Sequence, residues 1–229
     1  MDNIFKRERA LIGEENFNKL QNARIAVVGI GGVGGYTCEM LARAGIGELL
    51  LCDFDKVDET NINRQIIALT STVGLAKVDV MEERLKLINP NIKVVKVNAV
   101  FNPDLLNEID LTKYDYIVDA IDKARNKLVL IKYAKENNIK IITALGTGNK
   151  FSVPNYVVGD IYETQYDMFA KKIRRQCRRL GIEELDVVYM KSDKILCNDN
   201  GSVGSISYHP CVCGATIAGF VVNKIIDSN

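Results

Sequence analysis

A run of glycines is the first feature of the sequence with an evident chemical use. Gly29, Gly31, Gly32 and Gly34 fall in the segment Gly-Ile-Gly-Gly-Val-Gly, at the end of the apolar run 24–29. Glycines allow the backbone to turn sharply and to approach a phosphate, and the first turn of a following helix offers unpaired N–H groups. The segment therefore predicts a phosphate-binding loop, which by itself would suit NAD as well as ATP.

A carboxylate follows at the end of the next predicted strand. Asp53 lies 24 positions after Gly29, which is where a dinucleotide-binding fold holds a ribose hydroxyl. An aspartate at this point can also cap a loop without touching a ligand. The glycine run upstream favours the ribose contact.

A second group of polar residues separates the possible chemistries, and it comprises Asp55, Asn61, Arg64, Gln65, Lys77 and Asp122. Hydride transfer has no need of such a set. Attack on an α-phosphate with loss of pyrophosphate needs cations around the triphosphate and a carboxylate that holds magnesium. Arg64 and Lys77 would supply the positive charge, and Asp122 would be the metal ligand.

Each of these residues also has a simpler interpretation. Arg64 and Lys77 could be solvated surface charges, and Asp122 could be the N-cap of the helix that follows it. Their shared position favours the chemical interpretation, because all lie near the C-terminal ends of successive predicted strands. In an open parallel sheet those ends border one crevice, so we expect the residues to converge there.

Short apolar segments alternate with helical patterns along the chain. They predict strands at 24–29, 49–53, 92–97, 116–119 and 140–144, with helices at 34–43, 75–88 and 125–135. This alternation predicts an α/β fold with a Rossmann-like, doubly wound, mostly parallel sheet and helices on both faces.

The remaining residues continue the pattern with predicted strands at 156–161 and 187–190 and predicted helices at 168–180 and 215–226. We expect this half to extend the same sheet. No Pro/Ser-rich linker or internal repeat divides the chain. We therefore predict a single domain over 1–229, with a nucleotide-binding part at 24–145 and a substrate or RNA side at 146–229.

The composition describes an ordinary globular protein. Apolar residues make up 47% and charged residues 26%. Because 30 Lys and Arg nearly balance 29 Asp and Glu, the net charge does not indicate a particular class of partner. No apolar run approaches the roughly 20 residues that span a bilayer, and residues 1–11 do not resemble a signal peptide. We expect a cytoplasmic protein with no membrane partner.

The six cysteines show no CxxC spacing, so we expect neither a disulfide framework nor a zinc site. Cys211 and Cys213 leave one alternative open, because a nucleophile needs only one exposed thiol of low pKa. The other interpretation is that they are small core residues. His209 is the only histidine, and we interpret it as structural.

A basic segment stands out in the second half, with six cations among residues 171–179. On a helix, Lys171, Arg174, Arg175 and Arg178 share one face. Such a face could be solvated, or it could contact the phosphates of an RNA.

The polar series as a whole resembles the ThiF/MoeB/ubiquitin-activating family, whose members adenylate a carboxylate with ATP and magnesium. The residues that carry the resemblance are Gly29 to Gly34, Asp53-Phe-Asp55, Asn61-Ile-Asn63-Arg64-Gln65, Lys77 and Asp122. The resemblance implies that Asp53 holds the ribose and that Asn61 and Arg64 hold the phosphates. It also implies that Lys77 lies at the pyrophosphate and that Asp122 binds magnesium.

Further segments are similar to the tRNA threonylcarbamoyladenosine dehydratase branch of that family, namely residues 12–14, 63–66, 73–77, 88–90, 119–122 and 204–207. That branch uses ATP to activate the threonyl carboxylate of a modified tRNA adenosine, which then cyclises with loss of water. The missing CxxC pairs favour this branch over MoeB-type members, which usually carry zinc. The resemblance also favours RNA as the partner of the basic helix.

The resemblance leaves several points open. The wider family uses an N-terminal arginine that often reaches the ATP of a partner subunit, and here Arg7 is preferred over Arg9, although a solvated end remains the alternative. A homodimer is expected on the same ground. A ubiquitin-like sulfur-carrier protein is the alternative partner, and a NAD-dependent oxidoreductase is the alternative from another class.

Overall fold

The structure is a computed structural model that describes residues 3–165, 167–191 and 203–228. One sheet of seven strands has the order β3-β2-β1-β4-β5-β7-β6. All neighbouring strands are parallel except β6 and β7, which are antiparallel. The strands are β1 (Arg24–Val28), β2 (Glu48–Cys52), β3 (Lys93–Val97), β4 (Tyr116–Asp119), β5 (Ile141–Ala144), β6 (Tyr156–Asp160) and β7 (Asp186–Met190).

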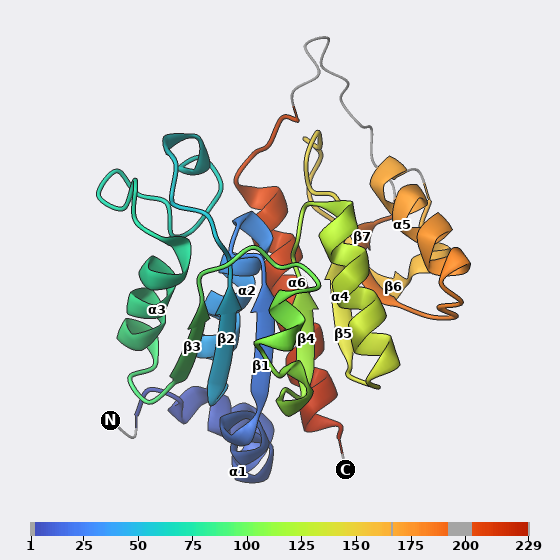
Figure 1. Ribbon diagram of the computed structural model, residues 1–229. Helices are drawn as coiled ribbons and strands as arrows, with labels where there is room; N and C mark the ends of the chain where they lie inside the picture. The colour runs from blue at the N-terminus through green and yellow to red at the C-terminus, as the bar shows by residue number, and fades with distance from the viewer. Residues whose placement is uncertain (1–2, 166, 192–202, 229) are drawn as a thin grey trace.

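Helices cover both faces of this sheet (Figure 1). They are α1 (Lys6–Asn22), α2 (Gly32–Arg43), α3 (Lys77–Ile88), α4 (Ala124–Glu136), α5 (Met168–Arg179) and α6 (Tyr208–Ile226). The core on one face takes side chains from α1, α2, α3 and α6, and the core on the other face takes them from α4 and α5. The predicted α/β fold with a mostly parallel sheet, extended by the second half of the chain, is confirmed.

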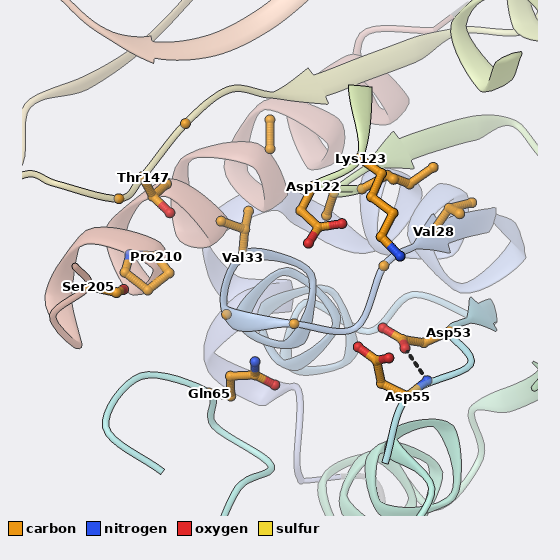
Figure 2. Close-up of a pocket in the computed structure, with 18 of the residues that line it drawn as sticks. Val28, Val33, Asp53, Asp55, Gln65, Asp122, Lys123, Thr147, Ser205 and Pro210 are labelled. Carbon is orange, nitrogen blue, oxygen red and sulfur yellow. Dashed lines mark hydrogen bonds between the residues drawn. The ribbon is translucent and has the colours of Figure 1, made fainter. Parts of the chain in front are cut away.

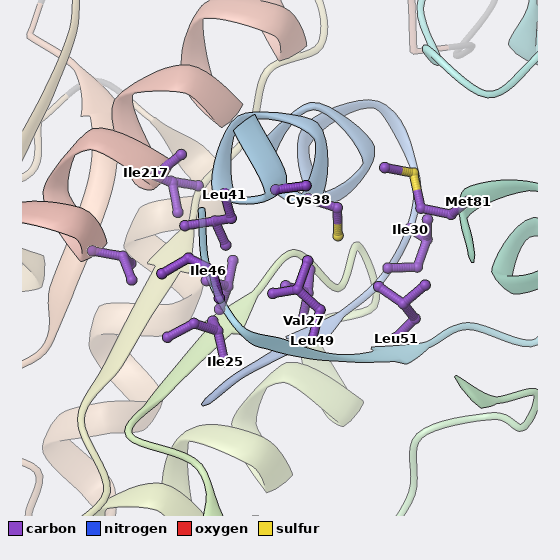
Figure 3. Packing of buried hydrophobic residues seen from close by; sticks show 14 of the residues in the cluster. Ile25, Val27, Ile30, Cys38, Leu41, Ile46, Leu49, Leu51, Met81 and Ile217 are labelled. Atoms are coloured by element: carbon purple, nitrogen blue, oxygen red, sulfur yellow. The ribbon is translucent and has the colours of Figure 1, made fainter. Parts of the chain in front are cut away.

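The strand sequences explain the two cores. Successive side chains of a strand point to opposite faces, so Ile25 and Val27 of β1 enter one core while Ala26 and Val28 enter the other. Figure 3 shows the first of these cores, where Ile25 and Val27 lie beside Leu41 of α2. Burial of each large apolar side chain favours folding by about 1.5–3 kcal/mol. The central strands β1, β2, β4 and β5 are therefore mostly apolar runs, as buried parallel strands require, whereas the edge strand β3 carries exposed lysines.

Two helices differ from the sequence-based expectation. The sequence pattern predicts no helix at 6–22, where the structure has α1 with a kink at Gly13, whose φ is 82°. The final helix is expected at 215–226, but α6 begins at Tyr208. Pro210 lies within its first turn, where a proline is tolerated. The other helices and strands begin and end within two residues of the predicted positions.

Close backbone contact joins α6 to α2. A Cβ atom on Gly214 would lie 2.6 Å from the Val33 carbonyl oxygen and 2.9 Å from the Cβ of Tyr36. The glycine that interrupts the apolar pattern of α6 is therefore needed for packing, since any larger residue would separate the two helices.

By length and hydropathy alone, α6 could cross a membrane, which differs from the expectation that no segment is long and apolar enough. In the fold it packs against α2 and the sheet, and Ile217, Val221 and His209 are buried there. His209 is fully buried and its Nδ1 lies 3.1 Å from the Tyr156 hydroxyl. These contacts are those of a core helix.

The two glycines in the middle of α6 give a matched pair for testing this contact. Gly214→Ala should lower the free energy of unfolding by about 1–3 kcal/mol, because the added methyl group overpacks the α2 contact. Gly219→Ala should raise it by up to about 1 kcal/mol, because alanine favours helix and nothing lies within 4 Å of the new Cβ. Urea unfolding measures both, and equal effects of the two variants would contradict the packing.

Candidate active site

A cleft of about 920 Å³ lies at the C-terminal ends of the central strands. Its walls include the ends of β1, β2, β4 and β5 and the segments that follow them. The strand order reverses between β1 and β4, which is where open α/β sheets form their ligand crevice. In Figure 1 the loops that border it lie at the top of the molecule, at the opposite end of the sheet from α1.

The glycine run forms the turn from β1 into α2 and lines this cleft. Gly29 has φ 94°, and a Cβ there would lie 2.6 Å from the Ala120 carbonyl oxygen. Gly34 packs against the Gly29 carbonyl, which a Cβ would approach to 1.8 Å. These two glycines are thus required by packing within the protein.

Gly31 has a different surrounding. It is the N-cap of α2, and no side chain among the described residues caps this helix start. A Cβ on Gly31 would meet only Gln65, at 3.9 Å. The space beside Gly31 is therefore open, and the free N–H groups of the first turn of α2 face a cleft that an anion could enter.

Asp53 fixes the other side of the glycine loop. Its Oδ2 accepts a hydrogen bond of 2.6 Å from the Ile30 N–H, and its Oδ1 accepts one of 2.8 Å from the Asp55 N–H. Figure 2 shows Asp53 and Asp55 side by side below the loop. Asp53 thus holds two cleft segments together and lines the cleft, and its contact with a ribose stays a prediction.

The long loop between β2 and α3 returns to its starting point before α3 begins. Backbone hydrogen bonds from Lys77 to Asp55 and from Val57 to Leu75 close its base. Lys77 is 5% exposed, and its Nζ lies 2.8 Å from the Asp55 carboxylate. A buried ammonium group therefore stands at the cleft, paired with the half-exposed carboxylate of Asp55.

The tip of this loop places Asn61, Arg64 and Gln65 in the cleft lining. Arg64 donates to the carbonyl of Thr60 and to the side chain of Asn63. Gln65 is 7% exposed, and its Oε1 is buried without a hydrogen-bond partner within the described part of the chain. An unpaired buried amide group is costly, so this oxygen can accept a hydrogen bond from a molecule in the cleft.

Asp122 lies on the opposite wall, above the glycine loop in Figure 2. The alternative that it caps α4 is wrong, because the N-cap of α4 is Lys123. The Lys123 ammonium group lies 5.3 Å from the centre of the Phe54 ring. The Asp122 carboxylate is therefore not used to cap a helix.

A buried ion pair supports this wall from below. Lys127 and Asp119 are both fully buried, with Nζ 3.0 Å from Oδ2. Asp119 also accepts from the Ile121 N–H, and Lys127 donates to the Ala144 carbonyl. Burial raises the pKa of the Asp119 carboxyl and lowers the pKa of the Lys127 ammonium group. The pair joins the ends of β4 and β5, just before the cleft segments.

The far wall of the cleft was not predicted. It consists of residues 144–149 at the end of β5 and after it, residues 167–169 at the start of α5, and Val203 and Ser205. Asn149 and Gly204 exchange two hydrogen bonds of 2.7 and 2.8 Å, and the Asn63 side chain donates to the Ser205 carbonyl. The segment before α6 therefore bridges the two walls. In Figure 2, Thr147 and Ser205 lie across the loop from Asp53.

Not all predicted site residues lie in the cleft. Arg7 is exposed on α1, at the other end of the sheet, so any contact with ATP would need the cleft of a second copy, and that role stays a prediction. Arg9 contacts Phe17 and Glu14 within its own helix.

The basic face of α5 divides into two pairs. Arg174 donates to the Thr164 hydroxyl at 2.6 Å, and Arg178 packs over the Tyr162 ring, so both contact the protein itself. Lys171 and Arg175 are exposed, beyond the first turn of α5 that lines the cleft. Arg178 is exposed as well, so only the half-buried Arg174 is withdrawn from an external partner.

The two cysteines at the start of α6 are poor nucleophiles. Burial raises the pKa of the Cys211 thiol, and it raises the pKa of Cys213 to about 12. A reactive cysteine needs a lowered pKa, so the core interpretation is the better one.

The cleft by itself offers few ligands to a metal. Within the described ranges, no group of three or more His, Cys, Asp or Glu side chains is arranged to hold one. Magnesium, however, is usually bound by one or two carboxylates together with substrate phosphates. Asp122 fits that manner of binding, and a metal held only by protein ligands does not fit.

The switch-point cleft, the open helix start and the cations around it define a Rossmann-like nucleotide-binding protein. A model of the ThiF family matches residues 5–227, and the chain belongs to that family. It is 34% identical to the tRNA threonylcarbamoyladenosine dehydratase of Bacillus subtilis, over 97% of this chain and 94% of that protein.

Two solved structures of Escherichia coli tRNA N6-threonylcarbamoyladenosine dehydratase, TcdA, are similar to this chain over nearly its whole length. The complex with AMP has a TM-score of 0.88 and covers 95% of this chain and 92% of that chain. The complex with ATP has a TM-score of 0.87 and covers 97% and 93%. Both are 34% identical to this chain. The resemblance inferred from the sequence is confirmed.

Two lysines on α4 test the buried ion pair. Lys127→Ala should lower the free energy of unfolding by about 3–5 kcal/mol, because it leaves the Asp119 charge buried and unpaired. Lys132→Ala removes an exposed lysine of the same helix that lies 3.6 Å from Glu136, and it should cost less than about 1 kcal/mol. Urea unfolding measures the free energy of unfolding of both variants. Similar losses would show that the buried Lys127–Asp119 pair matters no more to stability than the exposed lysine.

Proposed function

We propose that this chain is an ATP-dependent tRNA threonylcarbamoyladenosine dehydratase. The observation that carries the proposal is the cleft itself, in which an open helix start, Arg64, Lys77 and Asp122 surround one nucleotide-sized space. Relatives of that name match nearly the whole chain. The proposal states the substrate as a modified tRNA and the co-substrate as ATP.

The reaction removes one water from the substrate. A carboxylate oxygen attacks the α-phosphate of ATP, and pyrophosphate leaves. A group of the same side chain then closes a ring onto the activated carboxyl carbon, and AMP leaves with the oxygen that the substrate loses. Neither step needs a nucleophile from the enzyme, so the residues of the cleft act by positioning and by charge.

Each cleft residue has a role in this proposal. The start of α2 at Gly31 receives the phosphates, and Asp53 receives the ribose while it holds the loop. Arg64 and Lys77 stabilise the charge of the leaving pyrophosphate, with Asn61, Asp55 and Gln65 positioning the phosphate side. Asp122 would hold magnesium, which when bound neutralises phosphate charge.

The second half of the chain supplies the substrate side. We assign nucleotide binding to residues 24–145 and contact with the substrate to residues 146–229, within one domain. Lys171 and Arg175 lie beyond the far wall of the cleft and contact tRNA phosphates. The proposed location is the cytoplasm, and a homodimer would bring Arg7 to the cleft of a second copy.

ATP–pyrophosphate exchange with the purified protein tests the activity and the site together. Exchange should depend on tRNA that carries threonylcarbamoyladenosine, and the full reaction should yield a nucleoside lighter by one water. Lys77→Ala should reduce the rate by about 10²–10³-fold, the cost of removing one electrostatic group from a transition state.

The control for that experiment is Lys86→Ala on the same helix, where the lysine is paired with Glu82 and stands away from the cleft. It should leave the rate unchanged. Exchange that responds equally to unmodified tRNA would refute the substrate, and near-normal turnover by Lys77→Ala would refute the site.

The exposed charges of α5 make a separate prediction about salt. Replacing Lys171 and Arg175 by alanine should weaken tRNA binding and flatten the plot of log affinity against log salt by about 0.7–0.9 for each phosphate that is no longer neutralised. Filter binding over a salt series measures this slope. A double variant at Lys113 and Lys132, which are exposed elsewhere, should keep the slope of the wild type. If both variants bind alike, α5 is not the RNA contact.

A further inference from the structure

Ring closure on the activated substrate has to release a proton. A threonylcarbamoyl group carries two N–H groups on either side of one carbonyl, with the carboxyl carbon next to the threonyl Cα. A five-membered ring forms only if the nitrogen attached to the adenine ring, or the oxygen of the carbonyl between the two nitrogens, attacks the carboxyl carbon. Both routes remove one N–H proton while the carbon–oxygen bond to AMP breaks. A proton acceptor is therefore expected on the substrate side of the cleft.

Five aspartates of the described residues line the cleft, and most are already committed. Asp53 uses both oxygens for backbone N–H groups. Asp55 is paired with Lys77, and Asp58, whose Oδ1 accepts from Thr60, lies in the loop between β2 and α3 and not on the far wall. Asp122 lies on the nucleotide side, where the phosphates would be. This leaves the fifth carboxylate, Asp167, as the candidate on the far wall.

Asp167 is held firmly by one of its two oxygens. Its Oδ1 accepts hydrogen bonds from the Phe169 and Ala170 N–H groups, at 2.7 and 3.0 Å, as the N-cap of α5. These bonds fix the plane of the carboxylate relative to the cleft wall. The same residue type would be expected at this position for capping alone, so the second oxygen decides the question.

The second oxygen lies beside a glycine of the cleft wall. A Cβ on Gly146 would stand 3.5 Å from Oδ2 and 3.9 Å from Oδ1, and both Gly146 and Asp167 line the cleft. No hydrogen bond to Oδ2 occurs within the described part of the chain. Because Gly146 has no side chain, nothing from that residue screens the oxygen from a molecule in the cleft.

We propose that Asp167 Oδ2 accepts the N–H proton during ring closure, an inference that rests on the function proposed above. The attacking atom forms a bond to the carboxyl carbon, and the bond from that carbon to the AMP oxygen breaks with its electron pair. The proton moves from nitrogen to Oδ2, and the carboxylate is regenerated by solvent. Asp167 thus acts in the second step, whereas Lys77 and Arg64 act in the first.

The separation of the two steps gives a sharp test with Asp167→Asn. Asparagine is as good an N-cap as aspartate, so α5 should stay folded, which circular dichroism and thermal unfolding check. ATP–pyrophosphate exchange with modified tRNA should stay within about threefold of wild type, because it reports adenylation alone. Formation of the cyclised nucleoside should fall by about 10²-fold or more, and AMP-labelled tRNA should accumulate from ATP labelled at the α-phosphate.

Two further variants complete the experiment. Asp167→Ser keeps a capping side chain without a carboxylate and should behave like Asp167→Asn. Asp110→Asn changes an aspartate that caps a short turn outside the cleft lining, and it should cyclise at the wild-type rate.

The possible outcomes separate the proposal from its alternatives. Wild-type ring closure by Asp167→Asn would overturn the proposal and point to the leaving phosphate as the acceptor. Loss of exchange and closure together would overturn it in favour of a structural role. Absence of exchange in the wild type would refute the proposed function, which is a result distinct from either of these.

Discussion

The close approach of Gly29 to the end of β4 is the constraint on which the site depends. A side chain at Gly29 would meet the Ala120 carbonyl, so the backbones of the glycine loop and of the β4 wall can touch only with glycine there. Asp53 holds the loop from the other side through the Ile30 N–H. The start of α2 is thereby fixed before any nucleotide arrives, and a preorganised site loses less free energy when it binds.

The same wall depends on a buried charge pair. Lys127 and Asp119 lose hydration on burial, and each needs the other together with the backbone groups around it. Their hydrogen bonds reach Ile121, next to Asp122, and Ala144, at the start of the far wall. Polar groups at this depth stabilise a single arrangement of these two strand ends, since any other arrangement would leave a charge unpaired in the interior.

The sequence predicted the sheet because its central strands are buried on both faces and are mostly apolar runs. It also predicted which residues of the first half gather in the cleft, since parallel strands end at one edge. The sequence pattern missed α1, because Gly13 lies at a kink that the pattern does not reveal. It missed the start of α6, because Gly214 is explained only by its contact with α2. No feature of the sequence pattern marks Lys127 as buried, and the far wall depends on loops whose approach no local pattern specifies.

The segment before α6 connects the two walls of the cleft. Gly204 is hydrogen-bonded to Asn149 on the far wall, and Ser205 is hydrogen-bonded to Asn63 in the loop between β2 and α3. Neighbouring residues of one segment therefore set the spacing between the two walls of the cleft. Attack on an α-phosphate requires the reacting atoms to approach to about 3–3.5 Å. A cleft whose walls could separate would lose that alignment, so in the proposed reaction the short segment before α6 would act by holding the walls together.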